Sequence, residues 1–504
     1  MRTAAWAALV EHLSDLEVLD GTRCLLGWDE QTHMPPKAAA LRGAQLGLLG
    51  RMAHERLIDP RLGPWLAALD LGDPVQAACA RNLGRLVRRE LRISPALIDR
   101  LARARTAGFQ AWLDAKGSSD FVSFAPALEH VLELSLQRAA AIDPDRHPYE
   151  VLLEESDPGT SVAQLADLFA RLRRGLAPLV EAIARRPELP PLAGRFELER
   201  QWALSREVAA AMGYDFEAGR IDHAEHPFSA GIGPGDARIT THLDEHDLLA
   251  GLTGTIHETG HALYELGLPS EHVGTTVRDA ASAGLHESQS RFWENTIGRS
   301  PAFARWLAGL LARHFPASAP APELLCQALN RVERGLIRIY ADEVTYNLHV
   351  IVRFELELAL FERRLSVREL PEAWNDKMRE VLGVSPPDDA RGVLQDAHWA
   401  DGTFAYFPSY TLGNLYAASL GAAMSESLPT LWADVERGSF SSALGWLREH
   451  VHRQGHLLEA PDIIRAAVGE RDPVEDLLSH LWARHGALYG VERPRPLASS
   501  LGGE

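Results

Sequence analysis

The segment HETGH, residues 257 to 261, constrains this chain more than any other, because it implies both a local fold and a chemistry. On a helix, residues i and i+4 lie one turn apart on the same face, so His257 and His261 can bind one metal ion. Glu258 then lies beside the open coordination position, where a carboxylate can take a proton from a bound water. The segment predicts a metal-binding helix with hydrolytic chemistry.

The residues around this segment support a helix. Residues 247 to 268 place leucine and isoleucine at the spacing of a buried helix. Asp244 or Asp247 can cap its start. Gly254 and Gly260 lie inside it, and each costs about 1 kcal/mol relative to alanine. A purely structural helix would gain from losing them, so Gly260, beside the candidate ligands, suggests a close approach of another group.

A catalytic zinc site needs a third protein ligand, which must come from another segment. Glu287 is a candidate, in the segment HESQSRFWENTIG at residues 286 to 298. Charged residues recur there at intervals of three and four, while Phe292, Trp293 and Ile297 can pack inward, so we predict a second helix facing the first. From these residues alone, a solvated surface carboxylate at Glu287 is an equal alternative.

Several motifs occur in order along nearly the whole chain. They are HPF at 226–228, DARIT at 236–240, HETGH at 257–261, HESQ at 286–289, IRIYAD at 337–342 and GVLQDAHW at 392–399, with LGWDEQTHMPP at 26–36 and FPSYTLG at 407–413. Together they resemble the M32 family of metallocarboxypeptidases, the carboxypeptidase Taq type. The chain departs from that family at Ser156 in EESDPG, where an aromatic residue is expected, and at Thr276, where proline is usual.

The resemblance implies a metal-dependent carboxypeptidase that hydrolyses the C-terminal peptide bond of peptides. It assigns His257, His261 and Glu287 as metal ligands and Glu258 as the general base. The ion would polarise the scissile carbonyl and lower the pKa of its water, and Glu258 would accept the water proton and pass it to the leaving amine. One divalent metal per chain is expected, by default Zn²⁺, although Co²⁺ or Mn²⁺ suits the same ligands.

Exopeptidase action also needs a cation that binds the free carboxylate at the end of the substrate. The planar guanidinium of arginine suits this role, and the resemblance assigns it to Arg338 in IRIYAD. We predict a long helix from about 328 to 361 around it, in which an arginine would ordinarily be a surface residue in an ion pair. Tyr410 in FPSYTLG is a further candidate, as a phenol that bonds the terminal carboxylate or the tetrahedral oxyanion.

Two histidines stand in the remaining motifs. His226 precedes Pro227, which disfavours a helix and predicts a loop or strand. The resemblance suggests that His226 stabilises the oxyanion or the substrate carbonyl. We predict that His398 and Gln395 line the substrate groove or support residues that do. The alternative is that such a histidine is a hydrogen-bonded core residue.

The segment DARITTHL alternates and is rich in β-branched residues, so it predicts a short strand. An extended peptide substrate could lie along this strand and contact Asp236 and Arg238. A structural ion pair between these two residues fits the sequence equally well.

The 504 residues could form two or three domains, but continuous helical periodicity predicts one two-lobed unit that is mostly α-helical. We expect an N-terminal helical lobe at 1–190 and a metal-binding catalytic part at 191–504, divided near the proline-rich segment 186–195. A deep central groove would run between the lobes, with a small β-sheet beside the metal site, and would admit unfolded peptides.

Composition indicates which binding partners are disfavoured and which cellular compartment is expected. The net charge of −18 disfavours nucleic acid and anionic membranes, and no apolar run is long enough to span a bilayer. The N-terminal apolar stretch is too short for a signal peptide, so we expect a cytoplasmic protein. Cys24, Cys79 and Cys326 are predicted to be buried free thiols in a reducing compartment. The resemblance also implies a homodimer.

Two alternatives remain at this stage. HETGH with Glu287 does not determine where a peptide is cut, so an endo-acting oligopeptidase is compatible with the same metal site. The other alternative is a helical binding protein in which HETGH has no catalytic role.

Overall fold

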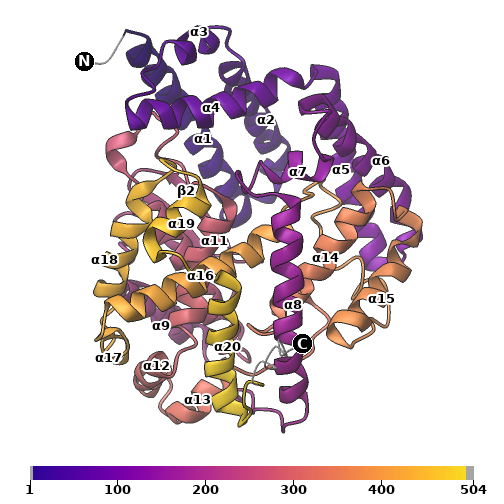
Figure 1. Ribbon diagram of the computed structural model, residues 1–504. Coiled ribbons are helices and arrows are strands. Elements are labelled where there is room, and N and C mark those ends of the chain that lie inside the picture. The colour runs from indigo at the N-terminus through magenta and orange to yellow at the C-terminus, as the bar shows by residue number, and fades with distance from the viewer. Residues whose placement is uncertain (1–3, 495–504) are drawn as a thin grey trace, which may run out of the picture.

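The computed structural model describes residues 4–494 and is mostly α-helical, with one small sheet (Figure 1). The α-helices of the N-terminal part are α1 (Ala4–Thr32), α2 (Ala39–Leu57), α3 (Leu62–Ala67), α4 (Pro74–Arg92), α5 (Pro95–Ser118), α6 (Phe121–Ile142), α7 (Pro148–Leu153), α8 (Val162–Ala184) and α9 (Leu198–Met212). Those that follow the sheet are α10 (Leu248–Glu265), α11 (Ala283–Arg291), α12 (Pro301–His314), α13 (Pro322–Leu329), α14 (Tyr346–Phe361), α15 (Leu370–Leu382), α16 (Phe407–Ser427), α17 (Leu431–Glu436), α18 (Ser441–His450), α19 (Ala460–Val468) and α20 (Pro473–Tyr489).

Short helical turns connect several of these helices. They are η1 (Pro36–Ala38), η2 (Ser270–His272), η4 (Arg338–Tyr340), η5 (Val367–Glu369) and η6 (His452–Gln454), all of 3₁₀ type, and η3 (Phe292–Ile297), a π-helical segment that continues α11. Within residues 4–494, no helix is long and apolar enough to cross a membrane.

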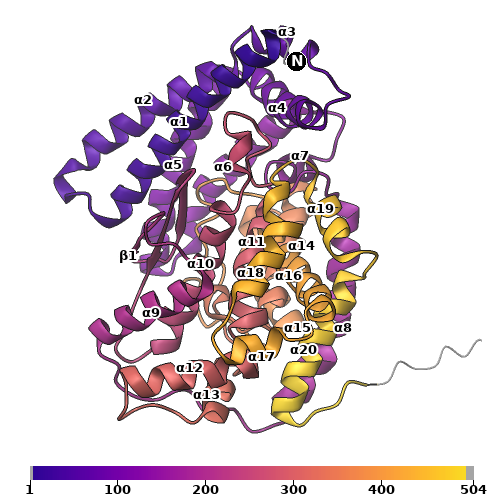
Figure 2. The same cartoon turned by 90° about the vertical axis from the view of Figure 1, so that its left-hand side faces the viewer.

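The hydrophobic core has two parts. Helices α1 to α4 enclose a small cluster that includes Trp6, Leu9, Leu13 and Leu83, and the α1–α2 hairpin extends along one end of the molecule (Figure 2). The main cluster begins at Ile93 and runs through the other helices, with α8 packed against α20. The two clusters therefore divide near residue 90. The lobe boundary at 190 and the groove remain predictions, although residues 186–195 are irregular as expected.

The sheet has three strands in the order β1 (Ile221–His223), β3 (Asp236–Thr241) and β2 (Ser229–Gly233). β1 pairs with β3 in parallel and β2 pairs with β3 antiparallel. The predicted strand in DARITTHL is confirmed as β3. This strand packs against α10 on one side, and β2 contacts both α10 and α1, so the sheet lies beside the helix that carries HETGH.

Helix α10 matches the predicted helix closely. Asp247 caps it by accepting a hydrogen bond from the backbone N–H of Ala250. The expected close approach at Gly260 is also present, because a Cβ there would lie 2.7 Å from the Cα of Ser290. Gly260 thus lets the backbones of α10 and α11 come together. The second predicted helix is α11 with η3, and its apolar residues at 292, 293 and 297 are buried.

The long helix predicted from about 328 to 361 is wrong in its first half. Helix α14 begins only at Tyr346, and residues 330–345 are irregular apart from the short turn η4. The carboxylate of Asp342 accepts hydrogen bonds from the backbone of Val344 and Thr345, which competes with helical pairing. The prediction for the cysteines needs one correction: all three are free, but Cys24 is exposed on α1.

Candidate active site

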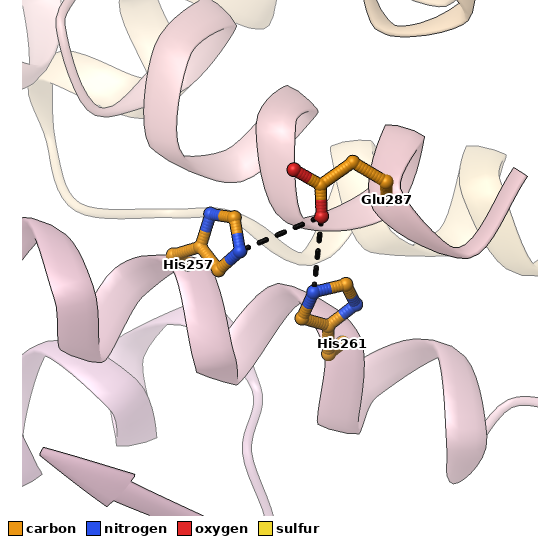
Figure 3. A group of neighbouring side chains, drawn as sticks. All are labelled: His257, His261 and Glu287. Atoms are coloured by element: carbon orange, nitrogen blue, oxygen red, sulfur yellow. Dashed lines mark ion pairs between the residues drawn. The ribbon is translucent and has the colours of Figure 1, made fainter. Parts of the chain in front are cut away.

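Helices α10 and α11 bring together the three predicted metal ligands (Figure 3). His257 and His261 point from successive turns of α10 towards Glu287 on α11. Oε2 of Glu287 lies 3.6 Å from Nε2 of His257 and 3.3 Å from Nε2 of His261. One ligand atom from each residue lies within 4.8 Å of the other two, as a shared metal ion requires.

The far side of each imidazole is already bonded, which leaves Nε2 for a metal. Nδ1 of His257 donates to Oε2 of Glu294 at 2.9 Å, and Nδ1 of His261 lies 2.6 Å from Nδ1 of His286. Burial lowers the pKa of His261 to about 4, so its ring is neutral at pH 7, the form that binds metals. This donor set fits a divalent cation.

Glu287 is buried, and each oxygen of its carboxylate accepts a hydrogen bond from its own helix. Burial alone would raise its pKa, but Arg291 and the two histidines keep the pKa of Glu287 well below its ordinary value. Nε of Arg291 donates to Oε1 at 2.7 Å, and Oγ of Ser290 donates to Oε2 at 3.1 Å. Gly413 on α16 makes room for it, since a Cβ there would lie 2.5 Å from Cγ of Glu287.

Asp157, in the EESDPG segment, fixes the start of α11. It is buried, and its carboxylate accepts hydrogen bonds from the backbone N–H of Gly284 at 2.9 Å and from the hydroxyl of Ser409. It therefore ties α11 to α16 beside Glu287. Sequence reasoning missed this role.

Glu258 lies next to His257 on α10 and is only 7% exposed. Burial raises the pKa of its carboxyl to about 7, and the negative charges of Glu287 and Glu294 act in the same direction. Within residues 4–494, no group donates a hydrogen bond to its carboxylate. The carboxylate of Glu258 is thus free to accept a proton or a hydrogen bond beside the three candidate ligands.

Arg338 lies in η4 and is buried rather than on the surface of a helix. Its Nε and Nη2 donate to Oδ1 of Asp396 at 3.1 and 2.8 Å, and its Nη1 donates to the hydroxyl of Tyr346 at 3.0 Å. Arg353, which is fully buried, pairs with the other oxygen of Asp396. Two guanidinium groups thus share one carboxylate.

The other candidates from the C-terminal motifs surround Arg338. Oε1 of Gln395 accepts from the backbone N–H of Arg338 at 2.9 Å and from Nη2 of Arg353 at 2.7 Å. The guanidinium of Arg338 lies 4.8 Å from the ring centroid of Tyr410, whose hydroxyl is 3.2 Å from Nε2 of His398. The structure brings these predicted residues into one cluster.

Tyr346 connects this cluster to the candidate metal centre. Its hydroxyl bonds Arg338, and the guanidinium carbon of Arg291 lies 4.3 Å from its ring centroid. Tyr406 lies between the same two regions: its ring is 5.4 Å from that of Tyr410, and burial, with a contribution from Glu287, raises its pKa to about 12. Sequence reasoning singled out neither tyrosine.

The residues predicted on and near the sheet are arranged differently. Arg238 and Asp236 form a two-point ion pair with both distances 2.8 Å, and the guanidinium of Arg238 stacks 4.4 Å from the ring centroid of Trp28 on α1. A contact of this pair with substrate remains a prediction. His226 lies in an exposed loop, as expected before Pro227, and within residues 4–494 no side-chain contact joins it to the other candidates.

Some of the missed residues had a signal in the sequence. Arg291 and Glu294 follow Glu287 by four and seven positions, so they share its helix face. Glu265 follows His261 by four positions and His286 directly precedes Glu287. Tyr346 and Asp157 had no such signal, because their partners come from distant segments.

Two partly buried histidines and a buried glutamate, with a second glutamate beside the histidines on their helix, form the arrangement of a metal-dependent hydrolase. The sequence matches the family described as "Carboxypeptidase Taq (M32) metallopeptidase" over residues 8–485. It is 40% identical to thermostable carboxypeptidase 1 of Thermus thermophilus, covering 97% of this chain and 99% of that one, and 41% identical to carboxypeptidase 1 of Bacillus subtilis, covering 75% and 77%.

A solved structure gives the same result. The M32 carboxypeptidase from Deinococcus radiodurans R1 has a TM-score of 0.94 at 38% identity, with 97% of this chain and 100% of that chain covered. The chain therefore belongs to the M32 family of metallopeptidases. It is a peptide hydrolase that depends on a divalent metal, which confirms the predicted family and fold class and disfavours the helical binding protein.

Proposed function

We propose that this protein removes the C-terminal residue of peptides, with His257, His261 and Glu287 holding the metal and Glu258 acting as the general base. The observation that carries the proposal is the convergence of these three ligand atoms within 4.8 Å of one another, next to the buried carboxylate of Glu258. A bound divalent metal would polarise the scissile carbonyl and acidify water at this point.

The side chains around the metal centre would then transfer protons and stabilise charge. Glu258 takes a proton from the attacking water and passes it to the leaving amine. Its free carboxylate and its raised pKa suit a group that must both accept and release a proton. Tyr410 and His226 are proposed to stabilise the negative charge that develops on the carbonyl oxygen.

The proposal for exopeptidase action rests on the charges around Asp396. Among the described residues, Asp396 is the one carboxylate that pairs with either Arg338 or Arg353, so the two cations are balanced by a single negative charge in direct contact. The terminal carboxylate of a peptide would supply a second one. The contacts through Tyr346 and Arg291 hold Arg338 at a fixed distance from Glu287, which would select the last peptide bond.

Other features of the predicted enzyme belong to the same proposal. Zinc is the default metal for two histidines and a glutamate, and cobalt or manganese suits the same set. Gln395 and His398 would position the carboxylate-binding cluster, while Asp236 and Arg238 would border the peptide. A deep groove, a homodimer and a cytoplasmic location are expected as well.

A matched pair of peptides tests the exopeptidase proposal. The metal-loaded enzyme should cleave a free-acid peptide and leave its C-terminal amide nearly intact. In Arg338→Ala, kcat/KM for the free acid should fall by about 10- to 100-fold, since a hydrogen bond to a charged group contributes about 1.5–3 kcal/mol. Arg185→Ala changes an exposed arginine that caps the C-terminal end of α8, outside the sequence motifs; this control should behave as the unaltered enzyme.

The alternative is an endo-acting oligopeptidase with the same metal site. It predicts equal cleavage of the acid and the amide, internal cuts in a peptide ladder read by mass spectrometry, and no change of preference in Arg338→Ala. Any of these results would remove Arg338 from its proposed role while leaving the metal site untouched.

A further inference from the structure

A chain of hydrogen bonds leads away from His261 on the side opposite Glu287. Nδ1 of His261 lies 2.6 Å from Nδ1 of His286, and Nε2 of His286 lies 2.8 Å from Oε1 of Glu265. All three side chains are largely shielded from solvent. We propose that His286 is a positioning residue that holds His261 in the ring orientation and tautomer that bind the metal, and that Glu265 acts only by fixing Nδ1 of His286 as the acceptor. This inference rests on the proposed function of His261 as a ligand.

The two short contacts admit one arrangement of protons when a metal occupies Nε2 of His261. An ionised carboxylate can only accept, so Nε2 of His286 carries the proton that is donated to Glu265. A metal at Nε2 of His261 leaves the proton of that ring on Nδ1, so Nδ1 of His286, 2.6 Å away, must accept it. With its proton on Nδ1, His261 presents an unprotonated Nε2 to Glu287, 3.3 Å away.

The surrounding residues hold this chain in place. Glu265 stands one turn after His261 on α10, and Gly231 on β2 makes room for it, because a Cβ there would lie 2.5 Å from Oε2 of Glu265. The ring of Tyr264 packs edge-on against His286 with 5.2 Å between centroids. His286 is thus clamped between α10 and its own helix, directly beside the ligand Glu287.

The two ligand histidines are supported in different ways. His257 donates directly to Glu294, whose carboxylate is also held by Arg291 and Arg299. On its Nδ1 side, His261 reaches a carboxylate only through a second imidazole. Loss of His286 should therefore release His261 alone, and outer hydrogen-bond partners of this kind are worth about 10- to 100-fold in metal affinity.

Two substitutions of similar size separate this role from a merely structural one. Asparagine carries its carbonyl oxygen one bond from Cγ, where histidine has Nδ1, so His286→Asn keeps an acceptor for His261. Glutamine places its polar atoms near the position of Nε2, so His286→Gln keeps a partner for Glu265 and loses the acceptor for His261.

The experiment measures zinc affinity of the metal-free proteins by competition with a chromophoric chelator, and the visible absorption of the cobalt-loaded forms. We expect His286→Asn to bind zinc within about threefold of the unaltered protein and to keep its cobalt spectrum. His286→Gln should bind about 10- to 100-fold more weakly and shift the spectrum. The thermal unfolding temperatures of the two metal-free variants should agree closely, which separates metal binding from stability.

A Glu287→Gln variant distinguishes the failure of this inference from the failure of the proposed function. If Glu287→Gln loses zinc while His286→Gln keeps full affinity, or if the asparagine and glutamine variants lose it equally, the positioning role is wrong and the metal site stands. If Glu287→Gln binds zinc as tightly as the unaltered protein, the proposed metal site fails and this inference fails with it.

Discussion

The candidate metal centre and the Arg338 cluster lie in the same molecule but are built in opposite ways. His257, His261 and Glu287 stand on two regular helices, and the spacing that brings them together is the spacing of the helix itself. Arg338 stands in an irregular segment that is held by Asp396 and Tyr346 from elsewhere in the chain. The proposed chemistry is thus placed on regular helices, whereas the proposed recognition of the terminal carboxylate depends on polar contacts between distant segments.

The two regions also depend on different stabilising forces. Around the metal centre, glycines let helices and side chains approach closely, as at Gly260 and Gly413. Around Arg338, buried charges of opposite sign balance each other. Burial raises the pKa of Asp396, but the positive charges of Arg353 and Arg338 outweigh that effect and hold the pKa far below its usual value. Substitutions in the two regions should therefore affect different measurements.

The largest effect is expected for Glu258→Gln, which removes the proposed general base and keeps the shape of the side chain. The value of kcat for a free-acid peptide should fall by about 10²- to 10⁴-fold, the usual contribution of a positioned base. Metal content and unfolding temperature should stay unchanged. Steady-state kinetics with metal analysis checks this, and full activity in the variant would end the assignment of Glu258.

Asp396→Asn should act on stability rather than on the metal. It leaves two buried guanidinium groups without their shared counter-charge, and breaking a buried pair in this way costs about 3–5 kcal/mol. Urea denaturation of the metal-free protein should show this loss in the free energy of unfolding. Zinc affinity should change by less than about twofold. An equal effect on zinc affinity would show that the two regions are not independent.

Two glycine substitutions on α10 give a smaller, matched comparison. In Gly260→Ala the new Cβ meets the backbone of α11, so the free energy of unfolding should fall by about 1–3 kcal/mol. In Gly254→Ala the nearest atom is Cγ of Pro227 at 3.5 Å, an ordinary contact. There the better helix propensity of alanine should raise stability by about 0.5–1 kcal/mol. A stabilised Gly260→Ala would contradict the close approach of α10 and α11.

These contrasts explain how far the sequence alone could predict the structure. Helix α10, its cap at Asp247 and the close approach at Gly260 all followed from local rules. The resemblance to a known family supplied Arg338, yet its helix was wrong, because Asp342 and Gln395 bond the backbone there in place of helical pairing. Asp157 and Tyr346 went unnoticed, since no local pattern records contacts between segments that are distant in sequence.

The central claim is that His257, His261 and Glu287 hold one divalent metal. Anomalous diffraction from a zinc-loaded crystal tests it most directly. The account predicts one strong peak per chain at about 2.0–2.2 Å from Nε2 of both histidines and from a carboxylate oxygen of Glu287. A zinc-loaded, active enzyme whose anomalous peak lies elsewhere, with these three side chains uncoordinated, would contradict it.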